Sequence, residues 1–306
     1  MAGAVVDRQG EILCRMTIAS HGDDEPLKRL IGLIRDLVDW VSRIGRDSIS
    51  VLGVGLGVPG VVHTDRNTVS LCPGLGWEKL AIGDLVRDEI GLPVWLDNDL
   101  NAITLGEAWC GSLQGISHGI CVAVGTGLGA GIQINGEIYR GVNGASGEIG
   151  LWVLNKTSSI EPSSGYGSLE SFVAGPGILR RAVELSANST TDLETIAGPL
   201  HALTAEDVFA AAARGDESAS RIVRDTTTAL GIAVANIALL MDVQRIVFTG
   251  GVTQTGEQLL EPVRKIVNQL VPFAPEIVHS TLGLDAGVLG SAYGLLKAID
   301  SLKSSV

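Results

Sequence analysis

The seven residues at positions 125–131, GTGLGAG, have the composition of a loop that binds phosphate. They follow the apolar, strand-like residues 120–124. Glycine lets backbone N–H groups turn outward and approach a ligand closely, and the hydroxyl of Thr126 adds a further donor. A tight hairpin without a ligand is the structural alternative. We expect the phosphate contacts to come from Gly125, Thr126, Gly127 and Gly129.

Residues 125–130 also fit the dinucleotide fingerprint G-x-G-x-x-A, which has to open a helix. Here residues 131–139, GIQINGEIY, indicate a strand, an Asn-Gly turn and a second strand. A glycine-rich turn inside a hairpin argues against a Rossmann site and favours a clamp for nucleotide phosphates. A second G-x-G-x-x-G at 55–60 is also followed by extended residues, and Pro59 removes a backbone donor. We interpret it as a strand followed by a turn.

Acidic and amide side chains mark a second candidate region at residues 97–101, DNDLN, where a strand is expected to end and a helix to begin. Ends of parallel strands are where α/β proteins place their sites. A carboxylate there can take a proton from an attacking hydroxyl, and an amide can bind a polyhydroxylated ligand. Asp and Asn are also favoured N-cap residues, so a purely structural role remains the alternative.

Two further acids and a glycine pair are weaker candidates. Glu148 stands among glycines, where it could hold sugar hydroxyls or be an exposed loop acid. Glu170 opens an expected helix and could simply favour the helix dipole. The pair Gly250–Gly251 joins a strand to a helix, which suits a base or ribose, or only a tight turn. The five histidines are scattered and have no metal-ligand spacing.

The composition describes a globular chain that is large enough for about two domains. It has 306 residues, 45% of them hydrophobic, 40 glycines and a net charge of −12. An acidic chain without a Lys/Arg cluster is a poor nucleic-acid binder. Four separated cysteines indicate free thiols in a reducing compartment. The start lacks signal-peptide features and no apolar run reaches the ~18 residues of a membrane span, so we expect a cytoplasmic protein.

Strands and helices alternate in two blocks, which predicts an α/β chain of two lobes. We expect a small lobe over residues 1–98, joined by a C-terminal helix at 286–306, and a large lobe over 99–285. The expected strands lie within 4–6, 11–18, 50–58, 93–96, 117–140 and 243–248. The expected helices lie within 25–44, 82–90, 99–109, 168–242, 256–270 and 285–301.

Taken together, these segments resemble the ROK family of bacterial sugar kinases and sugar-responsive repressors. The similarity covers nearly the whole chain and rests on several motifs in order: GVPG at 57–60, DNDLNA at 97–102, VGTGLGAG at 124–131, GEIG at 147–150, Leu169-Glu170 and GGV at 250–252. The resemblance implies an α/β fold of the two-lobed actin/hexokinase-like (ribonuclease H-like) type.

The resemblance also implies roles for the candidate residues. Asp99 would be the catalytic base, and Asn98, Glu148 and Glu170 would bind the sugar. The loop at 125–131 would hold phosphates and Gly250–Gly251 the adenosine. The implied reaction is phosphorylation of a hexose-like sugar by ATP with Mg²⁺, as in glucokinases. A homodimer or homotetramer is expected, and no nucleic acid or membrane partner.

Two departures from the family pattern matter. The positions of a histidine and three cysteines that hold zinc in the family fall here on Leu151, Glu161, Ser163 and Ser168. We therefore expect no zinc site, because the thiolate ligands are absent. The chain as given also starts in what resembles the second strand, without the family's first strand and its D-x-G-G-T phosphate loop. The strand at 51–58 is then expected to lack a neighbour.

Two alternatives to a kinase follow. The chain could be the sugar-sensing effector domain of a repressor, which acts without catalysis. It could also be a binding protein that has lost kinase machinery along with the two motifs.

Overall fold

The computed structural model describes the chain except for residues 20–24, 45–49, 155–167, 187–202 and 305–306. By its internal contacts the chain divides into two compact units. Unit 1 consists of Met1–Gly115, Ile138–Ser146 and Leu284–Val306. Unit 2 consists of Ile116–Glu137 and Gly147–Gly283. Residues 99–115 and 138–146 thus lie in unit 1, although the sequence predicted them in the large lobe.

Unit 1 begins with the antiparallel hairpin of β1 (Ala2–Val6) and β2 (Ile12–Thr17), as predicted. The amphipathic helix α1 (Pro26–Arg43) follows, with a proline in its first turn, where the missing N–H costs nothing. β3 (Val54–Val58) pairs in parallel with β7 (Val94–Asn98). Within the described residues, no strand other than β7 is hydrogen-bonded to β3.

A three-stranded antiparallel sheet in unit 1 was not predicted. It consists of β4 (Val61–His63), β5 (Thr68–Cys72) and β6 (Trp77–Leu80). The strands are short and separated by single turns of 3-10 helix, so they lack the length that makes alternation visible. The helix α2 (Ile82–Ile90) then leads into β7, and the core of this part is formed around Ile82, which is fully buried.

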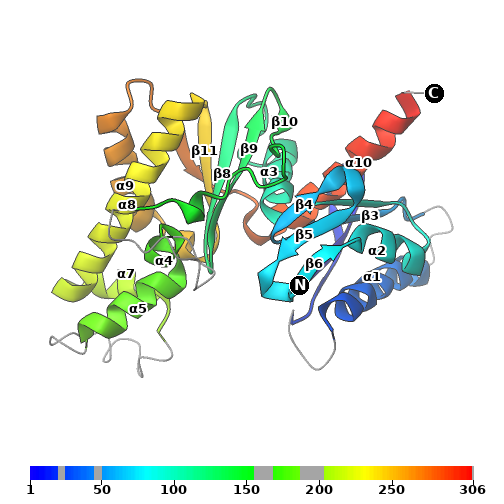
Figure 1. Cartoon of the computed structure of the whole chain (residues 1–306), viewed down its shortest axis with the longest axis horizontal. Coiled ribbons are helices and arrows are strands. Elements are labelled where there is room, and N and C mark those ends of the chain that lie inside the picture. The colour runs from blue at the N-terminus through cyan, green and yellow to red at the C-terminus, as the bar shows by residue number, and fades with distance from the viewer. Residues whose placement is uncertain (20–24, 45–49, 155–167, 187–202, 305–306) are drawn as a thin grey trace. The chain divides into compact units, whose positions relative to one another are not determined.

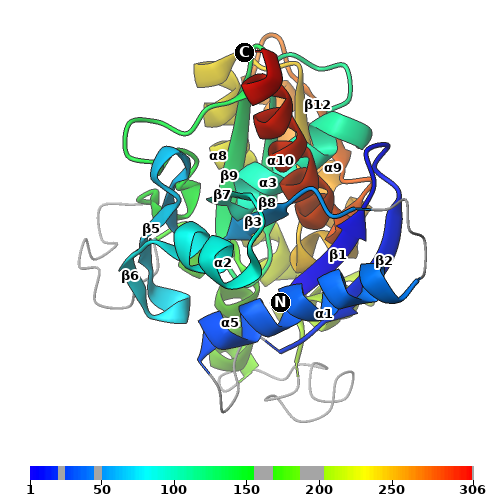
Figure 2. The same ribbon diagram turned by 90° about the vertical axis from the view of Figure 1, so that its right-hand side faces the viewer.

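The helices α3 (Asp99–Cys110) and α10 (Ala286–Ser304) are packed closely in unit 1, and Figure 2 shows them side by side. Glycines permit this approach. A Cβ at Gly290 would lie 1.6 Å from the carbonyl oxygen of Ala102, and one at Gly106 would lie 2.1 Å from that of Ala286. α10 also packs against β1 and β3, so it fixes α3 and therefore the end of β7.

Unit 2 is built on a five-stranded sheet of order β10-β9-β8-β11-β12, of which only Ile138 belongs to unit 1 (Figure 1). β8 and β9 are antiparallel, whereas β8, β11 and β12 are parallel. The strands are β8 (Gly119–Val124), β9 (Leu128–Ile134), β10 (Glu137–Ile138), β11 (Arg245–Thr249) and β12 (Glu276–His279). The sequence analysis missed β12, because four residues carry no clear period.

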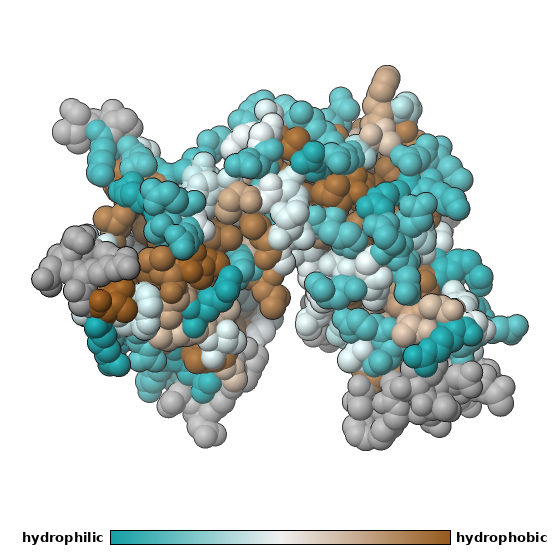
Figure 3. Space-filling view, turned by 180° about the vertical axis from the view of Figure 1, so that it is seen from behind, coloured by the Kyte–Doolittle hydropathy of each residue, from teal (hydrophilic) through white to brown (hydrophobic). Residues whose placement is uncertain are grey.

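The described helices of unit 2 are α4 (Glu170–Val173), α5 (Gly175–Ser186), α7 (Ala205–Ala213), α8 (Glu217–Met241) and α9 (Glu257–Leu270). Together with the sheet they enclose a core that includes Phe209 and Phe248. α8 is long and apolar enough to cross a membrane by composition, but 56% of its apolar window is buried in this core. Core helices of soluble proteins pass the same test, so this is weak evidence for a membrane span. On the face in Figure 3, hydrophilic and hydrophobic residues are interspersed in each unit.

Candidate functional site

Asn98 is the N-cap of α3 in unit 1. Its Oδ1 accepts hydrogen bonds from the backbone N–H groups of Leu100 (2.9 Å) and Asn101 (3.3 Å). Its Nδ2 donates to the carbonyl oxygen of Gly60 at 2.9 Å, which ties the end of β7 to the turn between β3 and β4. Asn98 therefore has the helix-capping role that the sequence allowed as the structural alternative. These bonds use one N–H of the Nδ2 amide, and the second can donate to a ligand.

Asp99 is the first residue of α3 and is half-buried. Its Oδ1 accepts a hydrogen bond from the N–H of Leu100 at 2.9 Å. Burial raises the pKa of the Asp99 carboxyl above its ordinary value, and this outweighs the backbone hydrogen bonds that lower it. A carboxylate with a raised pKa is a stronger base than a solvated one. The buried thiol of Cys72 lies near enough for the charge of Asp99 to add to the burial that raises its pKa.

A buried ion pair fixes this strand end, and the sequence analysis missed it. Asp97 is fully buried, and its Oδ1 accepts hydrogen bonds from the N–H of Asn98 and from Nδ2 of Asn101, both at 2.8 Å. Its Oδ2 lies 2.8 Å from Nε and 2.6 Å from Nη2 of Arg140. No local signal links the two partners, because they are 43 residues apart.

In unit 2 the glycine stretch forms the turn between β8 and β9, so the predicted hairpin is confirmed. The N–H of Gly125 donates to the carbonyl oxygen of Gly127 at 2.9 Å. The N–H of Gly175, the first residue of α5, donates to the carbonyl oxygen of Gly125 at 2.8 Å. The turn is therefore held by α5 and does not open a helix, which agrees with the argument against a Rossmann site.

Glu170 begins α4 and reaches the same turn. Its Oε2 accepts a hydrogen bond from the N–H of Leu128 at 2.7 Å, the first residue of β9. A Cβ at Gly127 would lie 2.7 Å from this oxygen. Within the described residues, Oε1 of Glu170 makes no hydrogen bond. The predicted sugar-binding acid thus has one oxygen committed to the turn and one available.

The pair Gly250–Gly251 follows β11, the parallel neighbour of β8, so it lies beside the glycine turn. A Cβ at Gly250 would lie 2.6 Å from the carbonyl oxygen of Val124, and one at Gly125 would lie 3.5 Å from the N–H of Gly251. Gly250 has φ +98°, which disfavours other residues. A Cβ at Gly251 would meet nothing within 4 Å. The predicted phosphate and adenosine motifs are therefore brought together at adjacent strand ends.

A cavity of about 250 Å³ lies in unit 2 at the ends of β11 and β12. Its lining is mostly polar and comes from both sides of the glycine pair: Phe248, Thr249, Thr253, Gln254, Gly256, His279, Ser280 and Gly283. Because the sequence analysis missed β12, it missed His279 and Ser280. The hydroxyl, amide and imidazole groups of this lining can hydrogen-bond the polar edges of a flat heterocycle.

Glu148 lies in unit 2 and is exposed. The glycines on either side of it pack on β9. A Cβ at Gly147, which has φ +82°, would lie 1.8 Å from the carbonyl oxygen of Ala130, and one at Gly150 would lie 2.5 Å from that of Leu128. The sequence GEIG thus positions this acid on the strand that follows the glycine turn.

The four positions that correspond to the family's zinc ligands are only partly described. Leu151 is 60% exposed, and Oγ of Ser168 accepts a hydrogen bond from the N–H of Leu154 at 3.2 Å. Glu161 and Ser163 lie outside the described residues. Among the described residues, no group of three His, Cys, Asp or Glu side chains could hold a metal ion. The absence of zinc from the protein stays a prediction.

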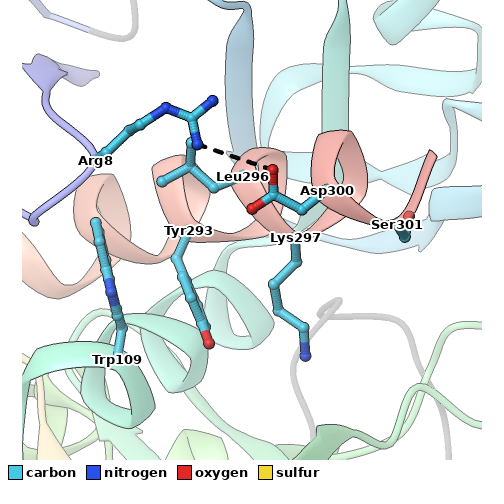
Figure 4. Close-up of a pocket in the computed structure, with 7 residues that line it drawn as sticks. All are labelled: Arg8, Trp109, Tyr293, Leu296, Lys297, Asp300 and Ser301. Carbon is cyan, nitrogen blue, oxygen red and sulfur yellow. Dashed lines mark ion pairs between the residues drawn. The ribbon is translucent and has the colours of Figure 1, made fainter. Parts of the chain in front are cut away.

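A second cavity, of about 450 Å³, lies in unit 1 and contains none of the predicted site residues (Figure 4). It is bounded by the turn after β1, the end of α3 and α10. Trp109 and Tyr293 are stacked with ring centroids 5.0 Å apart, and Arg8 lies 3.8 Å from Asp300. Because the two rings are stacked on each other, they pack α3 against α10.

Comparison with known proteins connects these features. The model of the ROK family matches residues 1–298. A glucokinase of Halalkalibacterium halodurans is 32% identical over 296 residues, which cover 95% of this chain and 90% of that protein. A xylose repressor of Caldicellulosiruptor bescii is 30% identical over 249 residues, which cover 81% of this chain and 62% of the repressor.

The chain is also similar to a solved structure, a ROK family glucokinase from Streptomyces griseus in complex with glucose and AMPPNP. The two share 30% sequence identity with a TM-score of 0.78, over 94% of this chain and 93% of that one. The predicted α/β fold of the actin/hexokinase-like type is thereby confirmed.

Proposed function

The chain belongs to the ROK family, and we propose that it is a glucokinase-like sugar kinase that transfers the γ-phosphoryl group of ATP to a hexose-like sugar. The observation that carries this proposal is in unit 2. The glycine turn at 125–127 and the pair Gly250–Gly251 lie at adjacent strand ends, next to a cavity that suits a nucleobase. The glucokinase relatives, one of them solved with glucose and AMPPNP, support the same reaction.

The nucleotide fits the residues that the structure provides. Gly251 offers a backbone N–H with open space where a side chain would stand. The backbone N–H groups of Thr126 and Gly127, with the hydroxyl of Thr126, would hold the phosphates, while the N–H of Gly125 closes the turn itself. Mg²⁺, when bound to the nucleotide, neutralises charge on the phosphates.

Asp99 would take the proton of the attacking sugar hydroxyl, for which its raised pKa suits it. Asn98, Glu148 and Oε1 of Glu170 would hydrogen-bond other hydroxyls and orient the sugar. Positioning then supplies most of the acceleration, and the base contributes about 10²–10⁴-fold. We further propose a cytoplasmic protein that forms a homodimer or homotetramer and binds no zinc.

The second candidate is a sugar-sensing effector domain without catalysis. The similarity to the xylose repressor favours it, although the chain spans only 62% of that protein. Both candidates share sugar binding, so only turnover separates them.

The test is an ADP-coupled assay with purified protein, ATP and Mg²⁺ across a panel of hexoses, and with ATP alone as the blank. The proposal expects sugar-dependent ADP formation well above the blank for at least one hexose, and at least ~10²-fold less of it in Asp99→Asn. Calorimetric binding of a hexose without any turnover would instead support the effector domain.

A further inference from the structure

We infer that Glu170 is a positioning residue for the nucleotide, because its carboxylate holds the glycine turn between β8 and β9. This inference rests on the proposed function for the identity of the ligand. It goes beyond the sugar-binding role, since it assigns Glu170 an effect on nucleotide affinity when no sugar is present.

The turn is tied at two points. At its start the carbonyl oxygen of Gly125 accepts from the N–H of Gly175, and at its end the N–H of Leu128 donates to Oε2 of Glu170. A hydrogen bond to a charged acceptor is about twice as strong as a neutral one. A glycine-rich backbone can adopt many conformations. Both hydrogen bonds are therefore needed to keep its N–H groups pointing toward the phosphate.

The surroundings of Glu170 leave its carboxylate little freedom. A Cβ at Gly127 would lie 2.7 Å from Oε2, and a Cβ at Gly150 would lie 3.3 Å from it. Two glycines therefore make the space into which this side chain fits. The same carboxylate therefore lies next to the turn and next to Gly150, two residues from Glu148.

The base of Glu170 is itself fixed. The N–H of Leu169 donates to the carbonyl oxygen of Trp152 at 2.9 Å. Nη2 of Arg181 donates to the carbonyl oxygen of Phe172 at 2.8 Å, and its guanidinium lies 4.0 Å from the centroid of the Phe172 ring. α4 is thus held to Trp152 at its start and to α5 at its end, and this support fixes the position of Glu170 relative to the turn.

The test compares Glu170→Gln and Glu170→Ala in the full chain. Gln keeps an oxygen that can accept from the N–H of Leu128, whereas Ala removes it. Calorimetry with AMPPNP and Mg²⁺, without sugar, measures nucleotide affinity alone. We expect Glu170→Gln to stay within about threefold of the parent, and Glu170→Ala to bind at least about 10-fold more weakly, which is about 1.4 kcal/mol. Glu184→Ala, an exposed glutamate on α5, is the matched control and should bind like the parent.

Two results would overturn the inference. One is Glu170→Ala binding AMPPNP within twofold of the parent while thermal melts show it folded. The other is unchanged hydrogen exchange at the amide of Leu128 in Glu170→Ala, because loss of the tie must expose that N–H. Hydrogen exchange also separates the two proposals. A parent that binds no AMPPNP contradicts the proposed function, and faster exchange at Leu128 in the variant would then still support the tie.

Discussion

Arg140 forms two close contacts to a single oxygen of Asp97, with Nε at 2.8 Å and Nη2 at 2.6 Å from Oδ2. The other oxygen of Asp97 organises the N-terminal turn of α3 through Asn98 and Asn101. This arrangement connects the segment Ile138–Ser146 to the strand end that carries Asp99, and both belong to unit 1. Asp97 is thus the structural acid of the sequence DND, whereas Asp99 is the acid that we propose for the chemistry.

The ion pair predicts a large loss of stability when only one partner is removed. Arg140→Met leaves a buried, uncompensated carboxylate, and such losses cost about 3–5 kcal/mol. Because the Arg140 side chain is 34% exposed, we expect a value near the low end. Urea unfolding of Arg140→Met, Asp97→Asn and the double variant gives the coupling energy. A loss below about 1 kcal/mol for Arg140→Met would show that the pair does not organise the strand end.

The raised pKa of Asp99 predicts how stability depends on pH. The folded state binds the proton of this carboxyl more tightly than the unfolded state, so the contribution of Asp99 is fully present below the ordinary pKa of an aspartate. It is lost as the pH rises through the raised pKa. Asp99→Asn should therefore be at least as stable as the parent at pH 7.

The measurement is a series of urea melts from about pH 3.5 to 8 on the parent and Asp99→Asn. The difference in unfolding free energy between them should grow with pH above the ordinary aspartate range. Asp88→Asn, whose side chain is 73% exposed, is the control with which the trend of Asp99→Asn is compared. A variant that is clearly less stable than the parent at pH 7 would mean that the ionised carboxylate stabilises the fold.

The glycine pair gives two matched variants with opposite expectations. Gly250→Ala places a Cβ 2.6 Å from the carbonyl oxygen of Val124 at φ +98°, so we expect a loss of about 1–3 kcal/mol in stability. Gly251→Ala meets nothing within 4 Å, so its stability should change by less than about 0.5 kcal/mol. The same methyl group would obstruct a nucleotide, and AMPPNP affinity should fall about 10-fold, or about 1.4 kcal/mol. Parent-like binding by a folded Gly251→Ala would place the nucleotide elsewhere.

Zinc content follows from the residues at the family's ligand positions. None of the four residues at these positions has a thiolate or an imidazole group: Leu151, Glu161, Ser163 and Ser168. Metal analysis of purified protein should find well under one zinc per chain. Stoichiometric zinc that survives dialysis against a chelator would contradict this expectation.

Much of the fold was predictable because it is built from long segments with a clear hydrophobic period and from strong turn sequences. The hairpin at the glycine turn, α8 and the strand before Gly250 all lie where the sequence analysis placed them. Short strands such as β5 and β12 were missed, since their form is decided by their partners in the sheet. The places of Asp99 and Glu170 at helix starts could be predicted from local sequence, while their roles stay predictions. Arg140, His279 and the contact from Glu170 to Leu128 could not, because they depend on packing between distant segments.

The central claim is that Asp99 is the base of a sugar kinase, and steady-state kinetics of Asp99→Asn tests it most directly. Asn keeps the size of the side chain and an oxygen that can accept from the N–H of Leu100, but it cannot take up the proton. With a sugar that the parent phosphorylates, we expect kcat to fall at least ~10²-fold, about 2.7 kcal/mol of barrier, while sugar affinity changes much less. Asn98→Ala should show the reverse, with weaker sugar binding and a milder loss of turnover. Near-normal kcat in an Asp99→Asn protein that melts like the parent would contradict the account.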